Sequence, residues 1–415
     1  MRKLGYLFAA LCLFAIEVGC GDQYRPVANP IIGQGGQPQT THFAFVVNSN
    51  PTAASTTMRI DVSGDTNLET QPVGSGAVAE AFLANSTGEI FTANSLADSV
   101  STFTTISTNT AVTTINVPLG SKPISVTTQR SGSIYSLNSS NNANCPKTGS
   151  ISVIDTSALA VTGTVCVGVN PVSFAQLPNG TKLYIANQAD NTVSVYDPDA
   201  RAVTTTITQA MGLGPSPTFV LTSTDSSYVF VVNKGDGVTS GTLSIITASN
   251  DQVAATASLG IGPTFAYIDT FLNRLYVVNT GGNSITVFDL ASINLSNNPV
   301  LPTLATVNVG SGPVGVTALP NGTKVYVANA LSNDVTVISA SSFGVLKTIP
   351  VGGDPVWIAS EPSSTKIYTA NKGSGNISII TTGNDTLVTN MPAPAQDPNC
   401  SSSCDRQQPM MILTL

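Results

Sequence analysis

The sequence predicts an all-β fold: a single β-propeller of eight four-stranded antiparallel blades, with a seven-bladed ring as the alternative. A strand-like segment that ends in asparagine recurs eight times, and consecutive terminal asparagines are 42 to 50 residues apart. Each repeat contains four short apolar runs separated by turn residues, without a helical pattern. A period in the forties with four strands per unit indicates a propeller rather than a solenoid.

Residues 312–355 show the elements of one blade most clearly. The four predicted strands are Val314–Leu319, Lys324–Asn329, Asp334–Ser339 and Val345–Val351. The Asn321-Gly322 pair lies between the first two strands and predicts a tight hairpin, because a tight turn needs residues that tolerate positive φ. The second strand, KVYVAN, does not alternate apolar with polar residues. Both of its faces should therefore pack against apolar neighbours.

The asparagine that ends each second strand is the most regular polar position in the chain. These residues are Asn48, Asn94, Asn138, Asn187, Asn233, Asn279, Asn329 and Asn371. A catalytic group is needed once rather than eight times, so we predict a structural role. Asparagine tolerates a left-handed backbone, and its side chain bonds nearby backbone groups, which would close the turn out of the second strand.

The two ends of the chain predict how the ring closes. The N-terminal copy of the second strand, at His42–Asn48, has no first strand in front of it. The segment Pro409–Leu415, PMMILTL, is similar to the first strand Pro313–Leu319, PVGVTAL, but nothing follows it. We therefore expect the C-terminal strand to pair into the N-terminal blade, which removes the open sheet edges.

The repeat resembles the YVTN family of β-propeller repeats through Tyr326-Val327-Ala328-Asn329 and through the glycine-proline segments VGSGPVGV and VGGDPVWI. The resemblance covers nearly everything from about residue 41 to the C-terminus. It implies the propeller fold but says little about function, because one fold hosts many activities.

Residues 1–20 have the pattern of a signal peptide, with two basic residues and then an apolar run from Leu4 to Ile16. The Gly19-Cys20 pair resembles the cleavage box of bacterial lipoproteins, which implies that Cys20 is the lipidated first residue of the mature protein. Glu17 departs from that box, where an apolar residue is usual. Ordinary secretory cleavage is the alternative.

Residues 21–40 are rich in Gly, Pro and Gln and predict a flexible tether between the signal peptide and a propeller at 41–415. A linker of about 20 residues spans roughly 25 Å, enough to hold the ring clear of a membrane surface. We therefore expect an extracytoplasmic protein of a bacterial cell envelope, in the periplasm or on the cell surface. Its only contact with the membrane would be the lipid anchor.

Four of the six cysteines remain for the propeller, and an exported protein can keep disulfides. Cys145 and Cys166 lie at the same rim of one blade and are predicted to pair. Cys400 and Cys404 would form a small ring just before the closing strand. Metal binding is the competing interpretation, but no histidine accompanies these cysteines and their spacing is not C-x-x-C.

Composition excludes several classes of function. The formal charge is −7, only 9% of the residues are charged, and no basic cluster is present, which argues against nucleic-acid binding. The single histidine, His42, lies at a strand end, which disfavours haem ligation and a histidine-containing hydrolytic triad. Trp357 is the only tryptophan, whereas propellers that bind quinone cofactors carry recurrent tryptophans. No cofactor is expected.

The loops between second and third strands share one face with the connections between blades, and loops on a rigid scaffold often carry function. Asp98, Asp190, Asp236 and Asp334 recur near matching positions of this face. Together they could hold Ca²⁺, although capping of turns is the preferred interpretation. Lys234 and Lys372, which follow terminal asparagines, are interpreted as surface lysines.

These patterns favour a binding or scaffolding module for an envelope protein or glycan, and not an enzyme. The alternative is a lactonase-like or sugar-acting hydrolase or isomerase, because the ring resembles the seven-bladed lactonases in outline. Such enzymes depend on acid–base groups in the central channel. Glu80 and Glu361 are the only glutamates on first strands, one on each side of the first blade. A self-associating surface-layer component is the second alternative.

Overall fold

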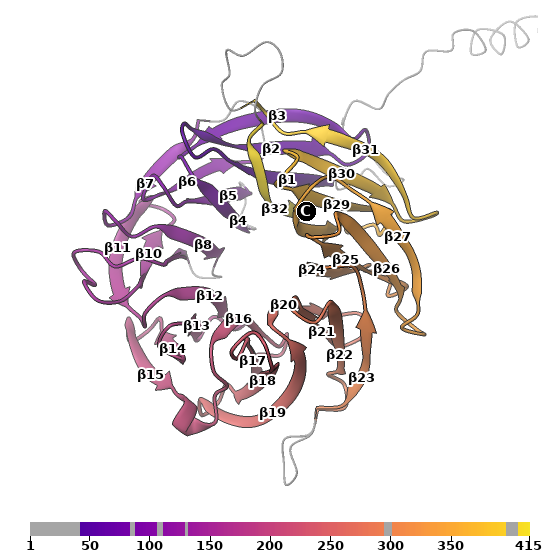
Figure 1. Ribbon diagram of the computed structural model, residues 1–415. Coiled ribbons are helices and arrows are strands. Elements are labelled where there is room, and N and C mark those ends of the chain that lie inside the picture. The colour runs from indigo at the N-terminus through magenta and orange to yellow at the C-terminus, as the bar shows by residue number, and fades with distance from the viewer. Residues whose placement is uncertain (1–41, 84–87, 106–110, 129–131, 294–300, 396–405) are drawn as a thin grey trace, which may run out of the picture. The chain divides into compact units, whose positions relative to one another are not determined.

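The computed structural model describes residues 42–83, 88–105, 111–128, 132–293, 301–395 and 406–415, which form one ring of eight four-stranded sheets (Figure 1). Every neighbouring pair of strands is antiparallel, so the predicted all-β propeller with eight blades is confirmed. The predictions for the signal peptide, the tether, Cys20, Cys400 and Cys404 lie outside the described residues. No helix in the described ranges is long and apolar enough to cross a membrane.

We number the blades along the chain and name their strands from the axis of the ring outward. Blade 1 contains β32 (Gln408–Thr414), β1 (Phe43–Ser49), β2 (Ser55–Asp61) and β3 (Thr66–Val73). Blade 2 contains β4 (Ala77–Leu83), β5 (Glu89–Asn94), β6 (Ser99–Thr104) and β7 (Thr113–Asn116). Blade 3 contains β8 (Pro123–Thr128), β9 (Ser133–Asn138), β10 (Ser150–Asp155) and β11 (Ala160–Cys166). Blade 4 contains β12 (Pro171–Gln176), β13 (Leu183–Asn187), β14 (Thr192–Asp197) and β15 (Ala202–Ile207).

The second half of the ring repeats the same order, preceded by the short 3₁₀ helix η1 (Gln209–Met211). Blade 5 contains β16 (Pro217–Thr222), β17 (Tyr228–Asn233), β18 (Ser240–Thr247) and β19 (Gln252–Ile261). Blade 6 contains β20 (Pro263–Asp269), β21 (Arg274–Asn279), β22 (Ser284–Asp289) and β23 (Thr303–Asn308). Blade 7 contains β24 (Pro313–Ala318), β25 (Lys324–Asn329), β26 (Asp334–Ser339) and β27 (Val345–Pro350). Blade 8 contains β28 (Pro355–Ser360), β29 (Lys366–Asn371), β30 (Asn376–Thr381) and β31 (Thr386–Pro392).

The C-terminal strand closes the ring, as the sequence predicts. β32 pairs antiparallel with β1, and Figure 1 shows the yellow strand beside the indigo sheet. Two further backbone hydrogen bonds join the ends, from Phe43 N–H to Leu415 O at 3.2 Å and from Leu415 N–H to Phe43 O at 2.9 Å. Blade 1 is thus assembled from both ends of the described chain, and its sheet needs both to be complete.

The core of the protein lies between neighbouring blades. In the second strands from β5 to β29, every residue after the first is buried, because one face packs on the preceding blade and the other on the following blade. This confirms the expectation from the unbroken apolar pattern of KVYVAN. Outermost strands expose many more residues, as in β15, where exposed and partly buried residues alternate. Burial of apolar area between blades is the main stabilising contribution.

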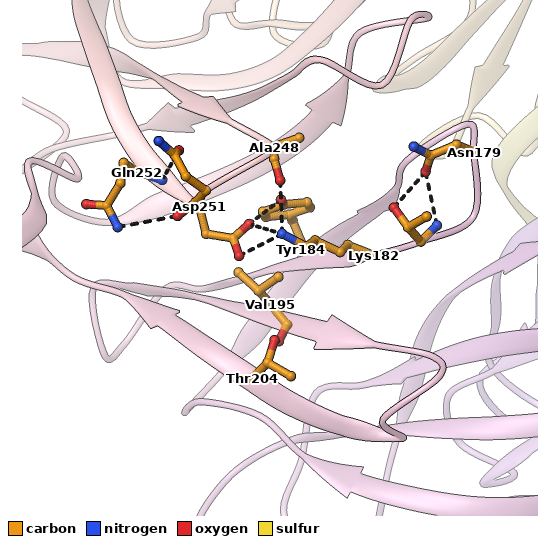
Figure 2. Close-up of polar contacts among 10 residues, drawn as sticks. Asn179, Lys182, Tyr184, Val195, Thr204, Ala248, Asp251 and Gln252 are labelled. Atoms are coloured by element: carbon orange, nitrogen blue, oxygen red, sulfur yellow. Dashed lines mark hydrogen bonds and ion pairs between the residues drawn. The ribbon is translucent and has the colours of Figure 1, made fainter.

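A lysine, a tyrosine and an aspartate form a contact that recurs between blades, and we call it the latch. Figure 2 shows the latch between blades 4 and 5: Lys182 Nζ lies 2.8 Å from Asp251 Oδ2 and donates to Ala248 O at 2.9 Å. Tyr184 OH donates to Asp251 Oδ1 at 2.6 Å. Burial, together with this hydrogen bond, raises the pKa of Tyr184, so its hydroxyl keeps the proton. The lysine comes from a second strand, and the aspartate from the outer turn of the next blade.

The latch recurs between blades 7 and 8, and its lysine–aspartate pair recurs between blades 8 and 1, where Tyr368 OH makes no hydrogen bond. Lys324 lies 2.7 Å from Asp385 between blades 7 and 8, and Tyr326 OH donates to Asp385 at 2.6 Å. Lys366 lies 2.6 Å from Asp65 between blades 8 and 1, where the ring closes. The same register position carries the lysine each time, because a second strand starts beside the outer turn of the following blade.

Candidate functional site

The innermost strands surround the axis of the ring. A binding site at the axis can therefore be formed by residues from several blades. Six of the eight innermost strands begin at proline, blade 2 begins at Ala77, and β32 begins at Gln408 with a proline as its second residue. The residue before the strand has positive φ in seven blades; these residues are Gly76, Lys122, Asn170, Ser216, Gly262, Gly312 and Asp354. This left-handed residue turns the chain from the outer rim into the innermost strand.

Three aromatic side chains meet near the axis, and we call them the axial aromatic cluster. The rings of Phe219 and Phe265, on blades 5 and 6, have centroids 4.7 Å apart. Phe265 also meets Trp357 of blade 8 at 5.6 Å, edge to face. Gly315 occupies the matching position in blade 7, so no side chain separates these two rings. Trp357 Nε1 donates to Ile412 O at 3.0 Å, which fixes the indole.

Hydroxyl groups join neighbouring innermost strands farther along the axis. Thr222 Oγ1 donates to Gln176 O at 3.1 Å, and Thr414 Oγ1 donates to Ser360 O at 2.8 Å. Ser360 Oγ in turn donates to Ala318 O at 3.0 Å. The axial surface therefore combines aromatic groups with neutral hydrogen-bonding groups.

Glu80 of β4 is buried and faces blade 1 rather than the axis. It pairs with Thr92 of β5, and its side chain is 2% exposed. Neither carboxyl oxygen makes a hydrogen bond. Burial raises the pKa of Glu80 well above its ordinary value, because a charged carboxylate is poorly solvated there.

Glu361, the residue after β28, makes hydrogen bonds that Glu80 lacks. Its Oε2 accepts from Thr365 Oγ1 at 2.5 Å and from Thr365 N–H at 3.3 Å, which caps the turn into β29. Burial alone would raise the pKa of Glu361, but the hydrogen bonds from Ser363 and Thr365 outweigh it and lower the pKa. The structure therefore does not bring Glu80 and Glu361 together as a pair of acid–base groups.

We call the face that carries the loops between second and third strands the loop face. The side chains of its four aspartates accept hydrogen bonds from nearby groups of the protein. Asp98 accepts from the N–H groups of Gly120 and Lys122, both at 2.8 Å, and Asp190 accepts from Val169 N–H at 2.5 Å. Asp236 caps its own loop, and Asp334 accepts from Asn329 Nδ2 at 2.7 Å. Within the described ranges no group of three His, Cys, Asp or Glu residues is placed to hold a metal ion.

Several large apolar side chains are exposed on the loop face, and sequence reasoning missed them. Leu331 is 78% exposed and Leu96 55%, and both occupy the second position after a terminal asparagine. A Cβ added to Gly76 or Gly312 would lie within 2.6 Å of these leucines, so both side chains lie where the chain enters an innermost strand. Leu119, in the connection between blades 2 and 3, is 86% exposed.

The terminal asparagines differ from the prediction in their backbone. None of the eight has positive φ, so the expected left-handed conformation is wrong; positive φ falls four residues later, for example at Asn191 after Asn187. The strand continues through the asparagine, which places its amide in the junction with the preceding blade. Asn187 Nδ2 donates to Ser194 Oγ at 2.9 Å, and Oδ1 accepts from Gly168 N–H at 3.0 Å. A Cβ at Gly168 would lie 2.5 Å from Asn187, which explains the glycine there.

The remaining candidates lie near the rim or at the ends of the ring. A disulfide joins Cys145, in the loop between β9 and β10, to Cys166 at the end of β11. His42 Nδ1 lies 3.1 Å from Leu415 O, beside the strands that close the ring. Lys234 and Lys372 follow terminal asparagines on the loop face, and the N–H of each donates to the connection before the innermost strand of its own blade.

Comparison with solved structures shows the propeller fold in proteins of different function. The periplasmic gluconolactonase PpgL of Pseudomonas aeruginosa is 13% identical, with a TM-score of 0.59, over 91% of this chain and 99% of that chain. AztD of Citrobacter koseri is 14% identical, with a TM-score of 0.59, over 91% and 98%. Hydrazine synthase of Kuenenia stuttgartiensis is 16% identical, with a TM-score of 0.55, over 74% and 96%. No curated protein matches the chain significantly.

The family comparison corrects two expectations from the sequence. Residues 125–350, more than half of the 415 residues, match the model of a family described as lactonase, seven-bladed β-propeller. A lactonase is an enzyme, so the expectation of a protein that is not an enzyme is wrong, as is the binding or scaffolding role. Repeat counts and loop composition describe the scaffold, which binding proteins and enzymes share. The chain belongs to this lactonase family, although its own ring has eight blades.

Proposed function

We propose that this protein hydrolyses lactones, with the cyclic ester bound at the axis of the ring on the side of the loop face. The match of residues 125–350 to the lactonase family carries the proposal. In the reaction, the oxygen of a water molecule attacks the ester carbonyl carbon. The bond between this carbon and the ring oxygen breaks, the ring oxygen takes a proton, and the product is a hydroxy acid.

The axial surface favours an unphosphorylated lactone with an apolar substituent. Among the described residues of the innermost strands, the ionisable side chains are Glu80, Tyr267 and Asp269, so none is a cation that would pair with a phosphate. The axial aromatic cluster offers apolar faces instead. Leu96 and Leu331 extend the apolar surface to the entrance from the loop face. Apolar groups of a ligand gain free energy when they leave water against such side chains.

The test is a panel of lactones assayed with the purified protein by release of acid at constant pH. The panel contains gluconolactone, its 6-phosphate, and γ- and δ-lactones with alkyl chains of increasing length. We expect turnover, with kcat/KM rising along the alkyl series. If no lactone is opened faster than in buffer, the proposal is wrong. If only the phosphorylated lactone is opened, the activity stands and the assigned substrate class fails.

Two substitutions locate the site. Trp357→Ala should lower kcat/KM for the alkyl lactones about tenfold, because it removes roughly 1.5 kcal/mol of apolar contact. Phe271→Ala is the matched control, because Phe271 is 64% exposed in the turn between β20 and β21, on the face opposite the loop face. Equal losses in both variants would contradict a site at the axial aromatic cluster. Circular dichroism checks that both variants remain folded.

We also propose that the ring is a YVTN-type propeller exported as a lipoprotein of the cell envelope. The Tyr326-Val327-Ala328-Asn329 strand and the Gly19-Cys20 pair after the apolar run support this proposal. Metabolic labelling with a fatty acid should mark the wild-type protein and not a Cys20→Ser variant, which should be released from the membrane fraction. Labelling that survives the substitution would contradict Cys20 as the anchor.

A further inference from the structure

The junction between blades 1 and 2 departs from the repeat on its inner side. The fourth residue of the innermost strand, counted from Pro409 in β32, packs against the preceding blade. It is apolar in seven blades: Val126, Phe174, Val220, Ala266, Val316, Ile358 and Ile412. In blade 2 this residue is Glu80. A carboxyl group thus stands where every other blade places an apolar side chain.

The facing side of the same junction also departs from the repeat. The third strand of blade 1 carries Thr57 at a position that is apolar elsewhere: Val100, Ile151, Val193, Leu243, Ile285, Val335 and Ile377. Its outermost strand carries Gln71 where the other blades have Ile115, Val165, Ile207, Ala257, Val307, Ile349 and Met391. Polar residues at these three positions, Glu80, Thr57 and Gln71, therefore distinguish this junction from the other seven.

These residues face one another across the junction. Between blades 4 and 5, the equivalent residues Val193 and Ile207 of one blade pack with Val220 and Val231 of the next in a single apolar cluster. By the same register, Thr57 and Gln71 face blade 2, whereas Glu80 and its strand partner Thr92 face blade 1. We call Thr57, Gln71, Glu80 and Thr92 the junction row.

The junction row is buried and its hydrogen bonding is incomplete. All four side chains are at most 7% exposed. Thr57 Oγ1, Thr92 Oγ1 and both oxygens of Glu80 make no hydrogen bond, and Gln71 donates to Glu69. Buried polar groups without partners cost free energy, and an unpaired buried charge costs far more. The folded junction therefore tolerates Glu80 as a neutral acid and disfavours the carboxylate.

Among the described residues of the neighbouring strands, no cation is placed to compensate a charge on Glu80. The neighbouring strands β1, β6, β8 and β32 contain no ionisable side chain, and β5 contains only Glu89, at its first residue. On blade 1, Arg59 of β2 lies over the ring of Phe43 at 3.8 Å and interacts with Glu69 of β3. The remaining ionisable group of β2 is Asp61, which caps the following turn through Ser63.

We propose that the junction row makes the interface of blades 1 and 2 a pH-dependent seam of the ring: it is closed while Glu80 carries its proton, and weakened and hydrated once Glu80 ionises. The proposal does not depend on the enzymatic activity. A raised pKa in the folded state means that the contribution of Glu80 to stability is fully present below the unfolded pKa, near 4.5. It is lost as the pH rises from there through the folded pKa.

The first test compares thermal unfolding of the wild type and Glu80→Val between pH 4 and 9. The valine restores the apolar residue of the repeat. The melting temperature of the variant should therefore rise relative to that of the wild type as the pH rises, by about 3 °C at pH 8. Glu80→Gln should show the same pH trend around a constant offset, because it removes only the charge. The difference between variant and wild type cancels the titration of all other groups. A difference that does not change with pH would overturn the proposal.

Glu361→Gln is the matched control with the opposite sign. The lowered pKa of Glu361 means that its contribution to stability is present above the unfolded pKa and is lost as the pH falls through the folded pKa. The melting temperature of this variant should therefore be lower than that of the wild type at pH 8 and equal to it in acid. Gain of stability by Glu361→Gln at high pH would mean that removal of a carboxylate elsewhere in the ring has the same effect, and it would overturn the assignment to Glu80.

Hydrogen exchange locates the effect. After correction for the intrinsic exchange rate, peptides from β4 and β32 should lose protection as the pH rises in the wild type and not in Glu80→Gln. Peptides from β28 and β29 should not change. Two outcomes would overturn the proposal: loss of protection around the whole ring, or stabilisation of the wild type but not of Glu80→Gln by K⁺ or Ca²⁺ at pH 8. The second outcome would make the junction row a cation site.

Discussion

Blade 1 has two junctions that solve the same packing problem with different residues. Toward blade 8, the register positions of the junction row are filled by Ile377, Met391, Ile412 and Val46. Toward blade 2, the same positions carry Thr57, Gln71, Glu80 and Thr92. The first junction also has the latch from Lys366 to Asp65, whereas Phe43 stands at the lysine position in the second.

The difference shows how a ring distributes its stability. Blade 8 contacts blade 1, which is assembled from both ends of the described chain. Apolar packing and a partly buried ion pair stabilise this junction. At the junction with blade 2, β32 lies beside β4, and Glu80 N–H donates to Met411 Sδ at 3.4 Å.

The largest effect should come from removing the strand that both junctions share. Deletion of residues 409–415 exposes β1 and removes Ile412 from the junction with blade 8. We expect loss of cooperative unfolding and of solubility, measured by circular dichroism and size-exclusion chromatography. A soluble truncated protein with unchanged thermal stability would contradict closure of the ring by β32.

Loss of the latch should come next. Lys366→Met leaves Asp65 without its ion pair, and we expect a loss of about 2 kcal/mol, below the range for fully buried pairs because both side chains are about one-sixth exposed. Lys182→Met, at an interior junction, is the control, because Lys182 likewise binds an aspartate and a backbone carbonyl. Chemical denaturation should give similar losses, while hydrogen exchange in β32 should rise only in Lys366→Met. Equal exchange in both variants would refute a special role at the closure.

The smallest effect should come from a hydroxyl in the polar junction. Thr57→Val replaces an unpaired buried hydroxyl with the residue type of the other blades and should stabilise the protein by about 1 kcal/mol. The reverse change, Val193→Thr, adds a hydroxyl at the same register position of blade 4 and should destabilise by about as much. Urea unfolding measures both. Destabilisation by Thr57→Val would show that the junction between blades 1 and 2 lacks the cost that we assign to it.

The repeat made much of the fold predictable. Eight blades were predicted from the spacing of the terminal asparagines, and closure of the ring from the similarity of Pro409–Leu415 to Pro313–Leu319. Both predictions were possible because every copy of the repeat forms the same local strand pairing. The asparagine backbone was mispredicted, since turn propensity does not show where an extended strand stops. The enzymatic class was also mispredicted, because the family comparison, and not the local residue pattern, carries it.

The sequence by itself determined the four-stranded unit, the number of units and the pairing of the two ends. These follow from local periodicity and turn chemistry, which act within a single blade. Only the tertiary structure decided which side chains of different blades meet: Phe265 with Trp357 across Gly315, Lys182 with Asp251, and Glu80 opposite Thr57. The physical reason is that the burial, charge state and partners of these groups depend on contacts between residues that are distant in the chain.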